Sequence, residues 1–192
     1  MSNYVSSDPR TDPRFAGALI RYHTWPTLRK QSNAEHMWNV ARILLAVFPE
    51  VSRSLLDRAL FHDIGEIRTG DLPYPIKADN PVLKSEVNRL EAEQLAFYHE
   101  VWGVPNLTAS AGYGPGLWLL KMCDMIEMME FATEECNLGN MYAAIIVNRV
   151  GDWLAEKMFE LRKTKDPFLQ DRYPGIRDYL KLRFPHKRDL IK

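Results

Sequence analysis

The sequence has few cysteines, no long apolar run and no excess of charge of either sign. Its two cysteines, Cys123 and Cys136, form no CxxC or zinc-ribbon pattern within the 192 residues. They predict reduced thiols in an intracellular protein rather than a disulfide framework. The 25 lysines and arginines balance the 25 aspartates and glutamates. This balance gives no support to binding of nucleic acid or of an anionic membrane as the main activity.

The longest uninterrupted apolar runs, residues 141–147 and 43–48, are far shorter than the ~20 residues that span a bilayer. The N-terminus has no charged region followed by an apolar stretch, so it does not resemble a secretory signal. We therefore expect a cytoplasmic protein with no membrane partner. Its length predicts one domain over residues 15–185, between a flexible lead-in over residues 1–14 and a basic tail over residues 186–192.

Helical periodicity extends through almost the whole chain. Ser32 and Glu35 have the spacing of a capping box, and the apolar residues behind them recur every three or four positions. Further helices are predicted from about residue 55 to Asp63 and over residues 81–102, 117–136, 141–162 and 176–182. Residues 69–81, dense in Gly, Pro, Asp and Asn, predict an ordered loop. No segment alternates long enough to predict a strand, so the predicted fold class is all-α.

Four residues with metal-binding side chains fall on predicted helices beside core-facing neighbours: His36, His62, Asp63 and Asp124. Each alone is more often a hydrogen-bonded core residue, but two imidazoles and two carboxylates can together hold one divalent ion. Glu66 follows His62 by four residues and Asp63 by three, so we expect its side chain on the same helical face. That position suits a general acid or base beside a metal-bound water.

His36, the pair His62-Asp63 and Asp124 resemble the H…HD…D signature of the HD-domain phosphohydrolases. Three stretches, within residues 21–36, 62–77 and 121–140, resemble one branch of that superfamily, the bacterial 5'-deoxynucleotidases and the phage dATP triphosphohydrolases. The most specific of them is HDIGEIRTGDLPYPIK at residues 62–77. The resemblance implies an all-helical HD-type bundle with a metal site in its core.

The resemblance also implies roles for the site residues. One divalent ion per chain (Co, Mn, Zn, Fe, Ni or Mg) is implied, and its ligands are His36, His62, Asp63 and Asp124. Glu66 becomes the acid or base near the attacking water, and Asp71 a second catalytic or water-positioning carboxylate. Two cations, Arg21 and Lys77, are implied to bind the substrate phosphate. Tyr22, Trp25 and Pro75 are implied to line the pocket for the base and sugar.

On this resemblance we expect metal-dependent hydrolysis of phosphate from 2'-deoxynucleotides, with no nucleic-acid partner. The segment from Trp25 to His36 is shorter than in the bacterial monophosphatases and closer to the phage enzymes. This favours a phage-type dATP triphosphohydrolase that depletes the dATP pool in the host cytoplasm, as a homo-oligomer. The alternatives are a 5'-deoxynucleotidase acting on dNMPs and, less favoured, a nucleotide-binding regulator, which would not need Glu66 and Asp71.

Overall fold

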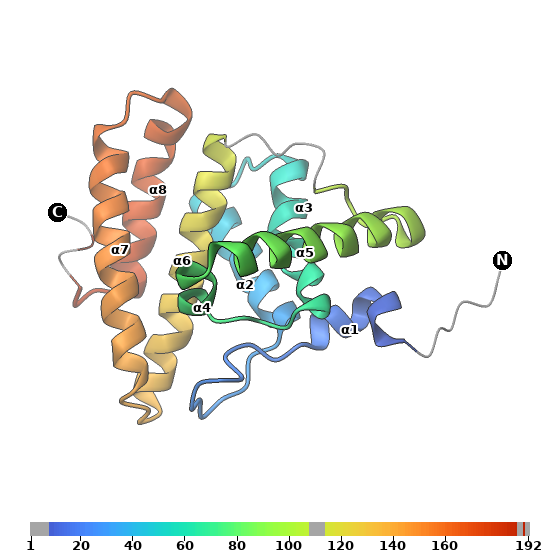
Figure 1. Cartoon of the computed structure of the whole chain (residues 1–192). Helices are drawn as coiled ribbons and strands as arrows, with labels where there is room; N and C mark the ends of the chain where they lie inside the picture. The colour runs from blue at the N-terminus through green and yellow to red at the C-terminus, as the bar shows by residue number, and fades with distance from the viewer. Residues whose placement is uncertain (1–7, 108–113, 188–189, 191–192) are drawn as a thin grey trace. The chain divides into compact units, whose positions relative to one another are not determined.

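A computed structural model describes residues 8–107, 114–187 and 190 (Figure 1). In these residues regular structure is helical, and an isolated β-bridge pairs Ile20 with Ser32. The elements in chain order are η1 (Pro9–Thr11), α1 (Pro13–Ala18), α2 (Asn33–Val47), α3 (Arg53–Phe61), η2 (Ile64–Arg68), α4 (Tyr74–Asp79), α5 (Pro81–Trp102), α6 (Pro115–Asn137), α7 (Ala143–Lys163) and α8 (Pro167–Arg183). The predicted all-α class is confirmed. Within the described ranges, every helix is too short or too polar to cross a bilayer.

The chain forms two compact units, each built from separate stretches of sequence. The first comprises Met1–Pro26, Lys30–Met37 and Leu60–Ala111, and the second comprises Thr27–Arg29, Trp38–Ala59 and Gly112–Lys192. Helix α2 therefore contributes its first turn to the first unit and its remainder to the second. The domain boundaries predicted at residues 15 and 185 stay predictions.

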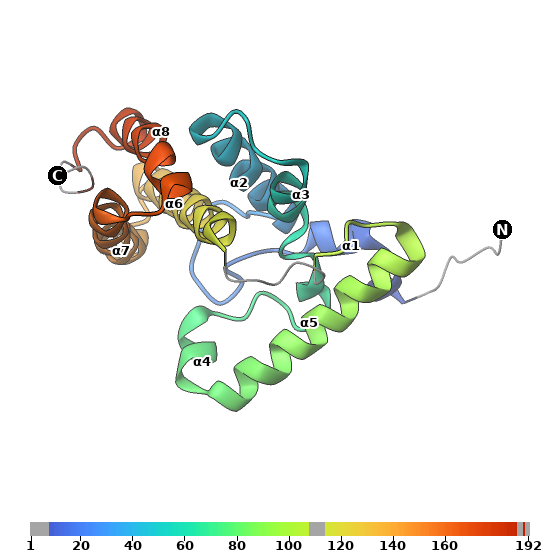
Figure 2. The same ribbon diagram turned by 90° about the horizontal axis from the view of Figure 1, so that it is seen from above.

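The first unit has a core of side chains from α1, the start of α2, η2, α5 and the residue that follows Gly103. Its fully or nearly buried members are Ala16, Met37, Ile64, Tyr98 and Val104. Helix α5 has the bounds that the sequence predicts, because Asn80 caps its start and Gly103 ends it in the left-handed conformation. Figure 2 shows α4 beside the first turns of α5. A Cβ at Gly65 would lie 2.7 Å from the Glu91 carbonyl oxygen, so the close packing of η2 on α5 requires glycine there.

In the second unit α6, α7 and α8 lie side by side (Figure 1). Their facing sides are apolar, with Leu119, Met122, Ile126, Met129, Leu154, Leu161, Ile176 and Leu180 almost fully buried. A polar network crosses this unit at Glu130 of α6. Its carboxylate accepts hydrogen bonds from Arg42 of α2 (2.7 Å) and from Tyr179 (2.8 Å) and Arg183 (2.6 Å) of α8. These bonds compensate the cost of burying the charge.

Three elements differ from the sequence prediction. Helix α3 ends at Phe61, so His62 and Asp63 lie in a turn before η2 rather than on the predicted helix. The predicted loop at residues 69–81 contains α4, where Pro75 occupies an early position that needs no N–H donor. Helix α8 begins at Pro167, well before the predicted residue 176, because Asp166 caps it and accepts a hydrogen bond from the Leu169 N–H (3.1 Å).

The two chain ends also differ in part from the predicted lead-in and tail. Residues 1–7 lie outside the described residues, but η1 and the start of α1 occupy much of the rest of the predicted lead-in. Side chains of α5 hold this segment, since Gln94 donates to the Arg10 carbonyl (2.6 Å) and Trp102 to the Thr11 carbonyl (2.7 Å). Within the predicted basic tail, Leu190 is buried.

Two helix-interior glycines of the second unit give a matched test of packing. A Cβ at Gly175 in α8 would lie 2.4 Å from the Val47 carbonyl oxygen, whereas one at Gly151 in α7 would meet Met129 at 3.9 Å. We expect Gly175→Ala to lower the free energy of unfolding by about 1–3 kcal/mol through overpacking. Gly151→Ala should be neutral or stabilising, since alanine is favoured in helices by about 1 kcal/mol. Urea denaturation measures both, and equal effects would contradict the packing argument.

Candidate active site

His36 lies one turn into α2, and the local sequence explains how it is placed there. The Ser32 hydroxyl accepts a hydrogen bond from the Glu35 N–H (3.2 Å), as the predicted capping box requires. The Ser32 carbonyl accepts one from the His36 N–H (3.0 Å). The His36 imidazole is fully buried. A capped helix end therefore fixes this ring inside the first unit.

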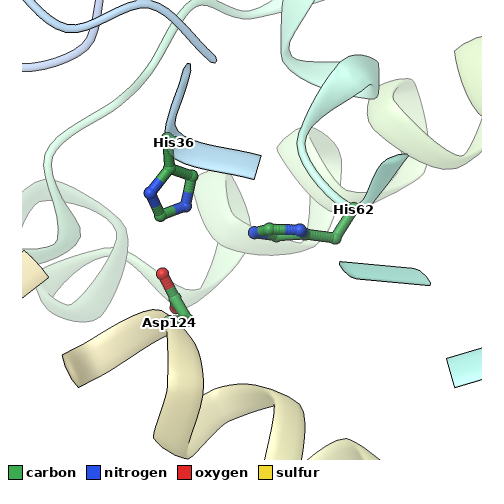
Figure 3. Close-up of side chains that lie close together, drawn as sticks. All are labelled: His36, His62 and Asp124. Carbon is green, nitrogen blue, oxygen red and sulfur yellow. The ribbon is translucent and has the colours of Figure 1, made fainter. Parts of the chain in front are cut away.

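The imidazoles of His36 and His62 converge on one carboxylate oxygen. Nε2 of each ring lies 3.5 Å from Oδ2 of Asp63. The ring centroids are 5.3 Å apart, with the ring planes inclined at 63°. Figure 3 shows the His36 and His62 rings of the first unit turned toward each other. Asp124 belongs to α6 in the second unit, and Lys121 donates a hydrogen bond to it (2.6 Å).

Arg21 lies at the same carboxylate. Its Nη1 donates to Asp63 Oδ2 at 2.7 Å, and its side chain is almost completely buried. The guanidinium also lies 5.5 Å from the centre of the Tyr22 ring. The sequence prediction gave Arg21 to substrate phosphate, and the structure pairs it with a predicted metal ligand. Asp63 Oδ2 therefore has a cation and two imidazole nitrogens around it.

Glu66 is buried in η2, beside this cluster. Its Oε2 accepts a hydrogen bond from Asn33 Nδ2 at 3.0 Å. Burial raises the pKa of Glu66 to about 8, and the negative charges of Asp63 and, more weakly, Asp71 add to the rise. The Arg21 guanidinium and the Asn33 hydrogen bond oppose it. Glu66 follows Asp63 by one turn, as predicted, but the turn is 3-10, with the Glu66 N–H bonded to the Asp63 carbonyl (3.1 Å).

Asp71 fixes the backbone of the segment that carries the predicted substrate residues. Its Oδ2 accepts a hydrogen bond from the Tyr22 N–H at 2.9 Å. Tyr22 has φ of 56°, a left-handed conformation that is uncommon for a residue with a side chain. The turn continues with a bond from the Trp25 N–H to the Tyr22 carbonyl (2.9 Å), and the Arg21 N–H bonds the Gln31 carbonyl (2.8 Å). Asp71 thus directly contacts the segment in which the sequence predicts substrate-binding residues.

The remaining predicted substrate residues of this unit lie on α4. Pro75 is exposed and Lys77 is partly exposed. The sequence gave no role to Glu91 of α5, whose Oε1 accepts a hydrogen bond from the Thr69 hydroxyl (3.1 Å). Burial raises the pKa of Glu91, and the Lys77 ammonium and the Thr69 hydroxyl oppose the rise. Glu91 therefore places a partly buried carboxyl group near Lys77.

The residues at this cluster fit a divalent metal ion. Imidazole nitrogen and carboxylate oxygen bind such ions at about 2.0–2.2 Å, which places two ligands of one ion roughly 3–4 Å apart. The 3.5 Å separations between each imidazole Nε2 and Asp63 Oδ2 lie in that range. The mixed nitrogen and oxygen donor set suits a transition metal.

A second carboxylate holds the segment that follows Trp25 in sequence. Glu135, buried near the end of α6, accepts hydrogen bonds from the backbone N–H groups of Leu28 (2.7 Å) and Arg29 (2.8 Å). The Asn140 amide donates a third (2.8 Å). Burial by itself would raise the pKa of Glu135, but these three hydrogen bonds outweigh it, and the pKa lies below its ordinary value. Glu135 is thus bound in its ionised form.

Comparisons with a family model and with solved structures show what the chain is similar to. Residues 20–99 match the model of the HD domain family. The fold is that of an HD-domain phosphohydrolase from Listeria innocua, with a TM-score of 0.67 at 20% identity over 93% of this chain and 88% of that chain. A cyanophage S-2L HD phosphohydrolase, solved with dA and one catalytic Zn²⁺ ion, matches with a TM-score of 0.58 at 22% identity over 92% of this chain and 97% of that one. The match over residues 20–99 and the likeness in fold agree with the resemblance to HD domains that the sequence predicts.

Relatives found by sequence belong to the predicted branch. The cyanophage S-2L dATP triphosphohydrolase is 34% identical over 123 residues, which cover 60% of this chain and 65% of the relative. The 5'-deoxynucleotidase of Vibrio parahaemolyticus is 28% identical over 109 residues, which cover 52% of this chain and 55% of the relative. The alignments thus span between half and two thirds of these relatives' lengths.

The Glu135 hydrogen bonds predict a pH-dependent stability difference. Glu135→Gln keeps the shape of the side chain but removes the charge and turns one acceptor into a donor. We therefore expect the variant's free energy of unfolding to be lower by about 1–3 kcal/mol at neutral pH. Because the pKa of Glu135 is lowered in the folded protein, its stabilisation is complete above the ordinary value of 4.5 and is lost as pH falls below it. Denaturation of both proteins between pH 3 and 8 tests this. A difference in free energy of unfolding between the two proteins that stays constant down to pH 3 would contradict this prediction.

Proposed function

We propose that this chain is a metal-dependent phosphohydrolase of 2'-deoxynucleotides, with dATP as the leading substrate. The observation that supports it best is the convergence of His36 Nε2 and His62 Nε2 on Asp63 Oδ2. The buried Glu66 carboxylate and the Arg21 guanidinium lie around the same group. A ligand cluster, an acid or base and a cation are the components that hydrolysis of a phosphate ester needs.

The residues that would hold the metal are His36, His62, Asp63 and Asp124. When bound, a divalent ion there would polarise a phosphoryl oxygen and lower the pKa of a water molecule. Asp63 would keep its hydrogen bond from Arg21, which orients the carboxylate as outer partners of metal ligands do.

The other side chains act on the proton and on the substrate. Glu66 is assigned the proton transfer, as the buried carboxylate next to the ligand cluster. Arg21 and Lys77 supply positive charge for the phosphate groups, since charge-assisted hydrogen bonds to phosphate are among the strongest available. Asp71 holds the Tyr22 backbone and so positions the segment with Tyr22 and Trp25, which we assign, with Pro75, to the base and sugar.

Relatives of two activities leave two candidate substrates. The short segment between Trp25 and His36 and the similarity to the cyanophage dATP triphosphohydrolase favour dATP. The similarity to the Vibrio parahaemolyticus 5'-deoxynucleotidase supports dNMPs as the second candidate. The homo-oligomer, the phage origin and the cytoplasmic location stay predictions from the sequence.

If the metal site is as proposed, replacing a ligand should remove the ion, and replacing an exposed carboxylate elsewhere should not. Protein purified without chelator should carry about one divalent ion per chain, and Asp63→Ala should lose most of it because the carboxylate between the imidazoles is gone. Metal analysis by mass spectrometry measures the content, and circular dichroism checks that the helices persist. Asp152→Ala, an exposed change on α7, is the control and should keep the ion. Full metal content and activity in Asp63→Ala would contradict the proposal.

A substrate screen separates the two candidates. We expect dATP to be hydrolysed faster than the other dNTPs and than any dNMP in the presence of Mn²⁺, Co²⁺, Zn²⁺ or Mg²⁺. Burying the 2'-hydroxyl of ATP without a hydrogen-bond partner would cost about 1–3 kcal/mol. The protein should therefore prefer dATP over ATP by about 5- to 150-fold. Chromatography of every product gives the rates. Equal rates on the four dNMPs without attack on dATP would establish the second candidate instead.

A further inference from the structure

Asn33, the first residue of α2, is fully buried, although most asparagines in folded proteins are exposed. Its Nδ2 donates hydrogen bonds to Glu66 Oε2 at 3.0 Å and to the Asp63 carbonyl at 3.3 Å. Its own N–H donates to the Leu19 carbonyl at 2.8 Å. One amide thus contacts the assigned acid or base and the backbone of an assigned metal ligand.

The Asn33 side chain does not cap its helix. An asparagine cap accepts backbone N–H groups through Oδ1, and here Ser32 Oγ performs that role for the Glu35 N–H. Asn33 Oδ1 is buried and accepts no hydrogen bond from the described residues. Because a buried acceptor without a partner costs stability, stability alone does not explain an asparagine at this position.

We propose that Asn33 is a positioning residue that holds the Glu66 carboxylate in place for proton transfer. His36 lies one turn further along the same helix, so Asn33 ties Glu66 to the element that carries a metal ligand. A glutamate side chain rotates about three torsions. A hydrogen bond at Oε2 restricts the side chain to one conformation and leaves Oε1 available to carry the proton. The inference rests on the proposed function and concerns how Glu66 is oriented within it.

The test replaces the donor without changing the shape. Asn33→Asp substitutes an acceptor oxygen for Nδ2, so Glu66 Oε2 loses the amide donor that holds it. The matched control is Asn39→Asp on the same helix, where Oδ1 accepts from Arg42 Nε (3.3 Å) and the acceptor is retained. On dATP, or on the best substrate of the screen, we expect kcat of Asn33→Asp to fall about 10- to 100-fold, within what general acid or base catalysis contributes. KM should change less than threefold, metal content should persist, and Asn39→Asp should stay within twofold of wild type.

A double-mutant cycle distinguishes positioning from a general structural role. If Asn33 acts through Glu66, then Asn33→Asp added to Glu66→Ala should lower kcat by less than threefold further. An additional loss of tenfold or more in that background would overturn the proposal, as would an unchanged kcat in Asn33→Asp. A fall in kcat that tracks loss of metal would also overturn it. Asn33→Ser, which favours a helix start but cannot reach Glu66, replaces Asn33→Asp if the latter does not fold.

A structural measurement keeps this inference separate from the proposed function. Crystal structures of metal-loaded wild type and Asn33→Asp would compare the Glu66 side chain directly. Glu66 should occupy one conformer in wild type and a different or divided one in the variant. An unmoved Glu66 would overturn the inference whatever the substrate. A moved Glu66 in a protein that hydrolyses no deoxynucleotide would support the orienting contact while refuting the proposed function.

Discussion

The first unit depends on how the charge of Asp63 is accommodated. A partly buried carboxylate is costly unless donors surround it, and Asp63 Oδ2 has the Arg21 guanidinium at 2.7 Å and two imidazole nitrogens at 3.5 Å. These groups come from three segments: the turn before α2, the first turn of α2 and the turn after α3. Removing the carboxylate would take away the closest acceptor of the buried Arg21 guanidinium. The same cluster that suits a divalent ion therefore also determines how these segments meet.

The break after Phe61 is what makes the cluster possible. If α3 continued as the sequence predicts, Glu66 would project from the face of an α-helix one turn beyond His62. Instead His62 and Asp63 form a turn, and η2 packs closely on α5 at Gly65. Glu66 is thereby buried, and that burial is the largest cause of its raised pKa. A short irregular element thus sets the acid and base properties of this residue.

The sequence predicted what depends on local pattern and residue type. Helix α5 was predicted to its ends from its apolar periodicity, and in the structure Asn80 caps its start and Gly103 ends it. His36, His62 and Asp63 were predicted as one cluster from their residue types and the HD signature, and the structure brings them together. The ion pair of Arg21 and the hydrogen bonds of Asn33 depend on tertiary contacts between residues 30 to 42 positions apart. No periodicity indicates such contacts.

The segment between Ile20 and Ser32 shows how a site can depend on residues outside it. Its ends are paired by the β-bridge, and Asp71 binds the Tyr22 backbone. Further along the same segment, Glu135 binds two successive backbone N–H groups. Trp25 therefore lies between two anchored stretches of chain, three positions after Tyr22 and three positions before Leu28. A hydrogen-bonded backbone limits where an aromatic side chain can reach, so these backbone hydrogen bonds restrict the positions open to the Trp25 side chain, which we propose contacts the base or sugar.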